Sequence, residues 1–127
     1  MTTDGLKHIT LTLARCKEFP EGSATRGYSF RAPLKPDGTL DSEAWKDARE
    51  QCAVRRFWDD EPDQHGLLVL RAGGAGGSSW VFDYNPNVPS DDETGYRLGS
   101  HRFVPGEYVS VKDDEGEMNT FVVASVE

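Results

Sequence analysis

The stretch FVPGEYVSVKDDEGEMNTFVVASV, residues 103–126, decides the fold class of this chain. Val109 and Val111 alternate with polar residues over 107–112, which is the two-residue period of a β-strand. The acidic, glycine-containing segment 113–116 predicts a turn, and the apolar run 118–126 predicts the returning strand. Because that run is nearly continuous around Phe121, we expect it to be buried on both faces.

The same alternation recurs toward the N-terminus. Further strands are predicted at 8–15, 25–32, 52–58, 67–72 and 79–84, with a short one within 96–104. The glycine cluster 73–77 predicts the turn of a hairpin, whereas the acidic stretch 59–63 and the Pro- and Asn-rich stretch 85–93 predict loops.

One segment has helical rather than strand periodicity. Asp41 is a suitable N-cap, and Leu40 and Trp45 stand at the two positions of a hydrophobic staple. Trp45, Ala48 and Cys52 form an apolar stripe at i, i+3 and i+7. The pattern predicts one short helix near residues 42–51.

Seven or eight short strands without repeated βαβ alternation predict a mainly β, β-rich α+β fold. We expect a small antiparallel barrel or sandwich and favour the barrel, because closure removes exposed strand edges. The 127 residues are predicted to form a single domain, 1–127. The helix is expected to plug one end of the barrel or to cover a face.

The charge is acidic and uneven. The net charge is −8; residues 1–58 carry 10 Lys and Arg against 8 Asp and Glu, whereas residues 59–127 carry 4 against 14. This charge counts against nucleic acid as a partner. No apolar run approaches a membrane span, and the first residues lack signal-peptide features, so we expect a cytoplasmic protein without a membrane partner. Cys16 and Cys52 are then expected to be reduced thiols in or near the core.

No motif for a cofactor, a metal or catalysis is evident. The glycine cluster 73–77 lacks the lysine and the following helix of a phosphate loop. His8, His65 and His101 lack metal-ligand spacing, and the acidic clusters are interpreted as solvated turns rather than calcium loops. The sequence therefore favours a non-catalytic domain without cofactor or metal. A small enzyme with its site in the barrel mouth remains the alternative.

A binding pocket is the favoured functional hypothesis. Arginines that converge across neighbouring strands could clamp a carboxylate or phosphate, although Arg55 and Arg56 must point to opposite sides of their strand. We predict a pocket near the packing face of the helix and the barrel mouth. Its predicted residues are Trp45, Trp58, Trp80, Tyr84 and Tyr96 as walls, with Arg56 and Arg102 supplying charge. The partner is predicted to be a small molecule or a protein, and the oligomeric state is left open.

The C-terminal hairpin also carries a resemblance. Residues 103–111, the charged glycine turn after them and residues 121–126 resemble the hairpin of small barrels such as PUA and ASCH domains. The likeness covers about a fifth of the chain. It implies an RNA- or nucleotide-binding module as an alternative function.

Overall fold

A computed structural model describes residues 6–72, 78–84, 93–96, 101–112 and 117–127, with the backbone alone in residues 71–72, 78–79 and 93–96. The elements are β1 (Leu6–Leu13), β2 (Ser23–Pro33), α1 (Ser42–Lys46), a 3-10 turn (Arg49–Gln51), β3 (Ala53–Trp58), β4 (Glu61–Ala72), β5 (Ser78–Asp83), β6 (Glu93–Tyr96), β7 (Tyr108–Lys112) and β8 (Met118–Val126). No helix within these residues is long and apolar enough to cross a membrane.

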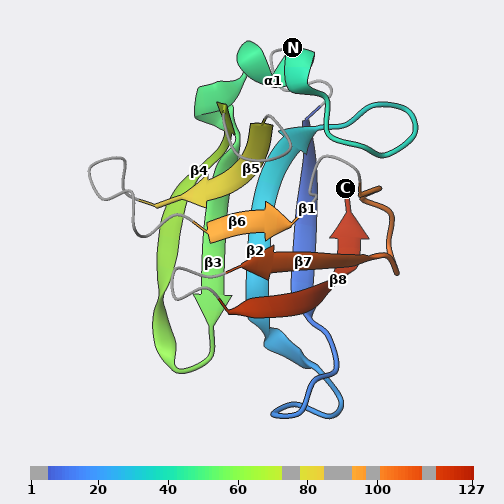
Figure 1. The fold of residues 1–127 in the computed structure, drawn as a ribbon, viewed down its shortest axis with the longest axis vertical. Helices are drawn as coiled ribbons and strands as arrows, with labels where there is room; N and C mark the ends of the chain where they lie inside the picture. The colour runs from blue at the N-terminus through green and yellow to red at the C-terminus, as the bar shows by residue number, and fades with distance from the viewer. Residues whose placement is uncertain (1–5, 73–77, 85–92, 97–100, 113–116) are drawn as a thin grey trace.

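The strands form a closed antiparallel barrel in which each strand pairs with its neighbour in sequence and β8 pairs with β1. This confirms the predicted β-rich class and favours the barrel over the sandwich. In Figure 1, β6 and β7 cross in front of β1 and β2, and α1 lies at one end of the barrel. The loop between β1 and β2 lies at the other end.

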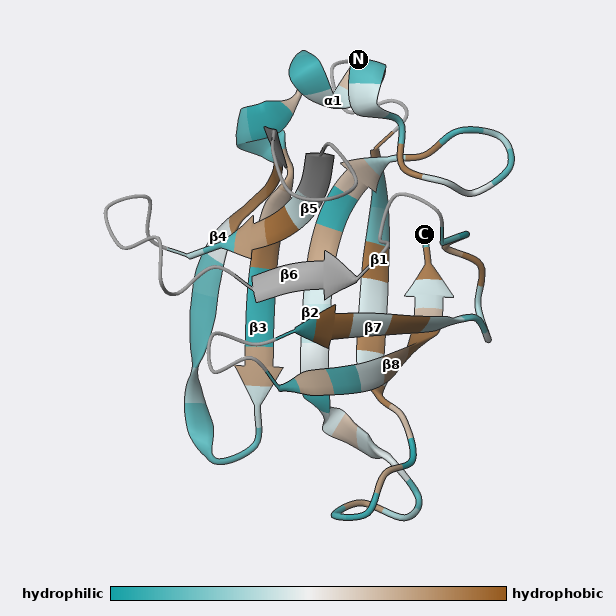
Figure 2. Ribbon diagram, in the orientation of Figure 1, coloured by the Kyte–Doolittle hydropathy of each residue, from teal (hydrophilic) through white to brown (hydrophobic). Residues whose placement is uncertain are grey.

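The barrel interior is filled by side chains of alternate strand residues, as is usual for an eight-stranded barrel. Figure 2 shows brown and pale or teal bands alternating along β1, β2 and β8. The largest fully buried side chains include Phe30, Phe82, Phe103 and Phe121. The rings of Phe30 and Phe82 are 5.4 Å apart, and those of Phe30 and Phe103 are 5.8 Å apart. Aromatic packing thus occupies the middle of the barrel.

The helix is shorter than the predicted 42–51. Asp41 caps it as expected, because its carboxylate accepts a hydrogen bond from the Ala44 amide at 3.0 Å. The helix ends at Lys46, and Ala48 has a non-helical backbone before the 3-10 turn begins. The helix ends early because the chain enters strand pairing soon after it: the Cys52 carbonyl accepts a hydrogen bond from the Leu68 amide at 2.9 Å. The chain must turn tightly to bring fully buried Cys52 into that ladder.

Strand β4 corrects the predicted loop at 59–63. It begins at Glu61 rather than Leu67, and its first half pairs with β3 through Arg56↔Gln64 and Arg55↔His65. Acidic residues normally disfavour strands, but here the opposite strand carries two arginines that form ion pairs with them. Cross-strand pairs of opposite charge stabilise a sheet.

Two further predictions near the C-terminus need correction. The short strand expected within 96–104 lies earlier, at Glu93–Tyr96, while Phe103 reaches the core from an irregular segment. The Phe103 amide donates to the Gly38 carbonyl at 2.8 Å, which fixes that segment without a strand. The β7–β8 hairpin is confirmed, but β8 is fully buried on its inner face only, because Phe121 and Val123 face the core and Val122 does not.

Candidate functional site

At the helix end of the barrel, two tryptophans are packed into the core. Trp45 and Trp80 are 5% and 6% exposed, and their rings meet edge to face at 5.4 Å. The Trp45 indole donates to the Leu68 carbonyl at 2.9 Å. Tyr84 is partly buried against the same core. These three residues, which were predicted to form the walls of the pocket, are therefore part of the core or packed against it. None of them lines the hollow that contains Arg56.

The opposite end is open. We call this hollow the open mouth; it has a volume of about 200 Å³ and lies where β1, β2, β3 and β8 meet the β1–β2 loop. Its lining residues are Leu13, Cys16, Glu18, Phe19, Tyr28, Arg56, Trp58, Glu117 and Asn119. Two of the predicted site residues, Arg56 and Trp58, are thus brought together in the open mouth.

Arg56 is the central charged group of the open mouth. It pairs with Tyr28 across β2 and β3, and both belong to the inward-facing row that contains Val54. The guanidinium lies 4.5 Å from the centre of the Trp58 ring, and its Nη1 donates to Glu61 at 2.9 Å. Its side chain is only 13% exposed. A cation partly removed from water over an aromatic face interacts more strongly with anions than one at an open surface.

Aromatic rings form the floor beneath Arg56. Tyr28 is 2% exposed, and its ring lies 4.9 Å from that of Phe82 and 5.1 Å from that of Phe121. Trp58 meets Phe121 edge to face at 6.4 Å. The floor is therefore packed into the rigid core, whereas the rim comes from loops and strand ends.

A second arginine holds that rim together. The Arg26 guanidinium lies 4.2 Å from the centre of the Phe19 ring, and its Nη2 lies 3.5 Å from Asp59 and 3.7 Å from Asp60. Its Nη1 donates to the Ser23 hydroxyl at 3.0 Å. Arg26 thus links the β1–β2 loop to the β3–β4 turn, and its side chain is only 12% exposed.

Arg102 does not join Arg56. It is exposed and lies beside Gly38, in the connection that leads to the helix. The pKa of Asp37 is lowered mainly by hydrogen bonds from Thr39 and, to a smaller degree, by the charges of Lys35 and Arg102. The two arginines that were predicted to supply charge to one pocket therefore do not line the same hollow: Arg56 lines the open mouth, and Arg102 lies beside Gly38. The side chain of Tyr96 lies outside the described part of the chain.

The two cysteines are free and sit in different environments. Cys52 is buried as predicted, and its burial raises the pKa of the thiol to about 11. Cys16 is exposed and lines the open mouth, which corrects the expectation that it lies in or near the core. Within the described residues no histidine lines the open mouth beside this thiol.

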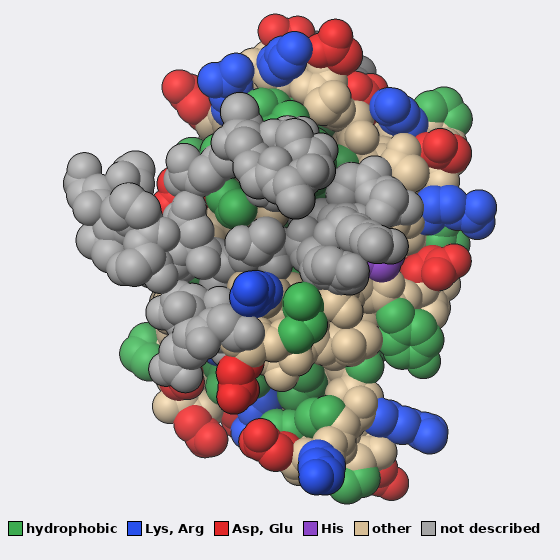
Figure 3. All heavy atoms as spheres, viewed as in Figure 1, with side chains coloured by type: hydrophobic (Ala, Val, Ile, Leu, Met, Phe, Trp, Pro, Cys, Tyr) green, Lys and Arg blue, Asp and Glu red, His purple; other side chains and the backbone are tan. Residues whose placement is uncertain are grey.

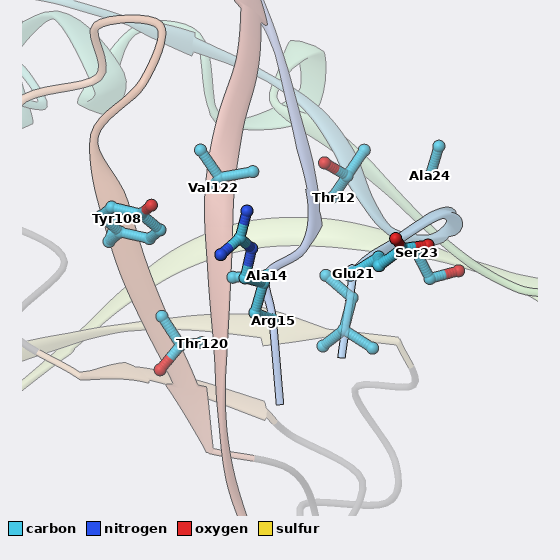
Figure 4. A pocket seen from close by; sticks show the side chains of 11 residues that line it. Thr12, Ala14, Arg15, Glu21, Ser23, Ala24, Tyr108, Thr120 and Val122 are labelled. Carbon is cyan, nitrogen blue, oxygen red and sulfur yellow. The ribbon is translucent and has the colours of Figure 1, made fainter. Parts of the chain in front are cut away.

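A larger hollow of about 500 Å³ lies on the outer side of β1, β7 and β8, as Figure 4 shows. Tyr108, Thr120 and Val122 lie on one side, Glu21 and Ser23 lie on the other, and Arg15 extends between them. Size alone would favour this hollow, but Tyr108 is 61% exposed and Arg15 is exposed too. We favour the open mouth because its charged group is held by the core and partly desolvated.

The basic residues of the first half are distributed over several surfaces. Arg56 lies in the open mouth and Arg26 at its rim, Lys46 and Arg49 lie at the helix, and Arg55 lies on the outer barrel wall. On the face in Figure 3, charges of both signs are interspersed without a broad field of one sign. Such a mixture does not favour a polyanion.

Sequence reasoning missed Phe19 and Glu61 as site residues because both were assigned to breaks between strands. One signal could have found Glu61: it follows Arg56 by five residues across a tight turn, a spacing that brings opposite charges together in a hairpin. Phe19 had no such local signal, because its contact with Arg26 depends on how the β1–β2 loop folds back.

No group of three or more His, Cys, Asp or Glu residues in the described ranges is arranged to hold a metal ion. Comparison of the chain with protein-family models, with curated proteins and with solved structures gave no match.

Proposed function

We propose that this protein is a non-catalytic binding domain whose open mouth takes a small molecule with an anionic group next to an apolar or aromatic body. The single observation that supports this is the placement of Arg56, 13% exposed, over the Trp58 ring. An arginine at such a site can bind a carboxylate through two parallel hydrogen bonds. The ring beside it offers a surface on which a planar group can stack.

In the absence of a ligand, the carboxylate of Glu61 occupies the position beside Arg56 that a ligand carboxylate would take. Its carboxylate bonds to Arg56 at 2.9 Å, but its own side chain is 50% exposed and stands at the first residue of β4. It can therefore swing into water while Arg56 stays fixed on Trp58. An incoming carboxylate would replace one ion pair by another, so that no buried charge is left uncompensated.

The volume limits the ligand. About 200 Å³ is below the roughly 300–1,000 Å³ that is typical for pockets of drug-sized ligands. The ligand would be a fragment-sized molecule, or a single group of a larger molecule that extends past Glu18 and Glu117 on the rim. The two rim carboxylates would disfavour a ligand with several negative charges.

The experiment is a titration of a panel of small carboxylates, with benzoate as the first probe, followed by nuclear magnetic resonance of the three indole N–H groups. We expect the Trp58 signal to shift with saturation, while the signals of Trp45 and Trp80 stay unchanged because both lie at the helix end. Arg56→Gln should weaken binding about tenfold or more, since a charge-assisted hydrogen bond contributes about 1.5–3 kcal/mol.

Two controls make the result decisive. Lys46→Gln removes a cation at the helix and should leave the affinity unchanged, and Trp58→Phe identifies the indole signal. The proposal fails if no carboxylate shifts the Trp58 signal, or if Arg56→Gln binds the probe as tightly as the unmodified protein.

A further inference from the structure

A second hollow lies on the outer wall of the barrel, across β1, β2, β3 and β4. We call it the wall groove; its volume is about 320 Å³, and its side chains come from His8, Ser29, Arg31, Ala53, Arg55 and His65. The strand register places these residues side by side: His8 pairs with Arg31, Ser29 with Arg55, and Arg55 with His65. Directly opposite residues on one face have Cβ atoms about 4.5–5.5 Å apart.

The groove is hollow because small and long side chains alternate in it. Ser29 and Ala53 are short, and they lie on neighbouring strands between the longer side chains of Arg31 and Arg55. Larger side chains at these two positions would fill the space between the strands. The result is a floor of hydroxyl, methyl and backbone groups with basic side chains around it.

The charges in the wall groove are only partly compensated. Arg55 is 49% exposed and lies 3.3 Å from Asp63, and its guanidinium lies 5.1 Å from the centre of the Phe57 ring. Within the described residues, no carboxylate lies within salt-bridge distance of Arg31. On the other border, the backbones of His8 and Glu127 hydrogen-bond to each other, so that Glu127 lies beside His8 just after the end of β8.

The orientation of the imidazole adds to this arrangement. His8 Nε2 and the Ser29 hydroxyl share a hydrogen bond across β1 and β2. The bond holds the imidazole beside the groove floor. Each imidazole stands directly opposite an arginine in the sheet, His8 opposite Arg31 and His65 opposite Arg55. The four side chains therefore form two neighbouring rows of hydrogen-bond donors that an anion between them could engage.

We propose that the wall groove is a second binding site, which takes a phosphate group carried by a small molecule. Basic groups from four strands surround the space, which suits the tetrahedral oxygens of a phosphate better than the two oxygens of a planar carboxylate. Arg55 and Arg56 are neighbours on β3 and point to opposite sides, so the barrel wall separates this site from the open mouth. The two sites therefore bind their ligands through different arginines.

The test is a titration with inorganic phosphate at constant ionic strength, followed by backbone amide resonances, with chloride as the competing anion. We expect saturable shifts confined to the wall groove. Arg31→Gln and Arg55→Gln should each weaken phosphate binding about tenfold or more. Arg15→Gln removes an exposed arginine elsewhere on the barrel, and Arg56→Gln alters the open mouth only; both should change the affinity less than twofold.

Three results would overturn the proposal. The first is phosphate binding that is unchanged in Arg31→Gln. The second is an equal loss in Arg15→Gln, which would mean general charge attraction. The third is tight binding of a single-stranded oligonucleotide without any binding of inorganic phosphate, which would make the wall a nucleic-acid surface. Loss of carboxylate binding in Arg56→Gln leaves this test unaffected, so the two proposals fail separately.

Discussion

The two ends of the barrel use the same residue types in opposite ways. At the helix end, Trp45 and Trp80 are buried and pack edge to face, and the indole of Trp45 donates to a core carbonyl. In the open mouth, Trp58 packs against Phe121 on one side and carries the Arg56 guanidinium on its ring. Aromatic side chains close one end of the barrel, and at the other end they hold a cation at the edge of solvent.

This difference predicts that the aromatic residues at the helix end contribute mainly to folding stability and that those in the open mouth contribute mainly to ligand binding. A buried tryptophan with its N–H bonded contributes to folding through apolar area and packing. An aromatic ring beneath a partly buried arginine contributes less to folding, because part of its surface stays available. We therefore expect substitutions at the helix end to affect the free energy of unfolding, and substitutions in the open mouth to affect mainly ligand affinity.

The largest expected effect comes from Trp45→Ala. It removes a 5% exposed side chain, its contact with Trp80 and its bond to Leu68. We expect a loss of about 3–5 kcal/mol in the free energy of unfolding. Trp58→Ala should lose only about 1–2 kcal/mol. Urea denaturation followed by circular dichroism measures both, and equal losses would contradict the division between the two ends.

A second effect concerns the alkaline stability contributed by the helix end. Because the pKa of Cys52 is raised from 9.0 to about 11, the folded state holds the thiol proton more tightly than the unfolded state does. The contribution of the protonated Cys52 thiol to the free energy of unfolding is complete below pH 9. It falls as the pH rises to 11 and is lost above pH 11. The expected decline is about 2–3 kcal/mol.

The difference between two variants isolates this decline. Cys52→Ala should lack it, whereas Cys16→Ala should keep it, since Cys16 is exposed in the open mouth. A thiol reagent at pH 8 should modify Cys16 quickly and Cys52 only on unfolding. Equal modification rates for the two thiols in the folded protein would show that the helix end is not closed.

The smallest effect compares charges at the two ends. Arg26→Ala removes a 12% exposed side chain that contacts Phe19 and two carboxylates, and we expect a loss of about 1–2 kcal/mol. Lys46→Ala removes an exposed ion pair with Glu43 on α1 and should change the free energy of unfolding by less than about 0.5 kcal/mol. Thermal unfolding of both variants tests whether the rim depends on Arg26.

Local patterns were enough to predict most strands, the barrel and the start of the helix, because alternation and capping are encoded within a few residues. The start of β4 was missed because Glu61 and Asp63 are stabilised by arginines on the neighbouring strand. The candidate site was predicted only in part, because contacts between residues far apart in the sequence are not encoded locally. Arg56 and Trp58 are two residues apart and share a face, whereas the distance between Arg56 and Arg102 depends on the direction of every strand between them.

The residues of the wall groove could also be predicted only in part from the sequence. The alternation of β2 already puts Ser29 and Arg31 on the face opposite Tyr28 and Phe30. Which residues of β1 and β3 stand beside them depends on register, and the register of the β1–β2 ladder shifts between Thr12 and Leu13, where extra residues of β2 are left unpaired. The sequence indicated that arginines on neighbouring strands could converge, but only the paired strands identify which arginines meet.

The order of strands around the ring also bears on how the chain folds. Seven of its ladders join strands that are consecutive in sequence, and the remaining ladder joins β1 to β8. Ladders between consecutive strands require the closure of loops that are short compared with the whole chain, whereas the β1–β8 seam requires the closure of a loop of nearly the whole chain, with a correspondingly larger entropic cost. We expect the seam to form last, so that Leu11 and Val123, which face each other across it, influence the unfolding rate more than the folding rate.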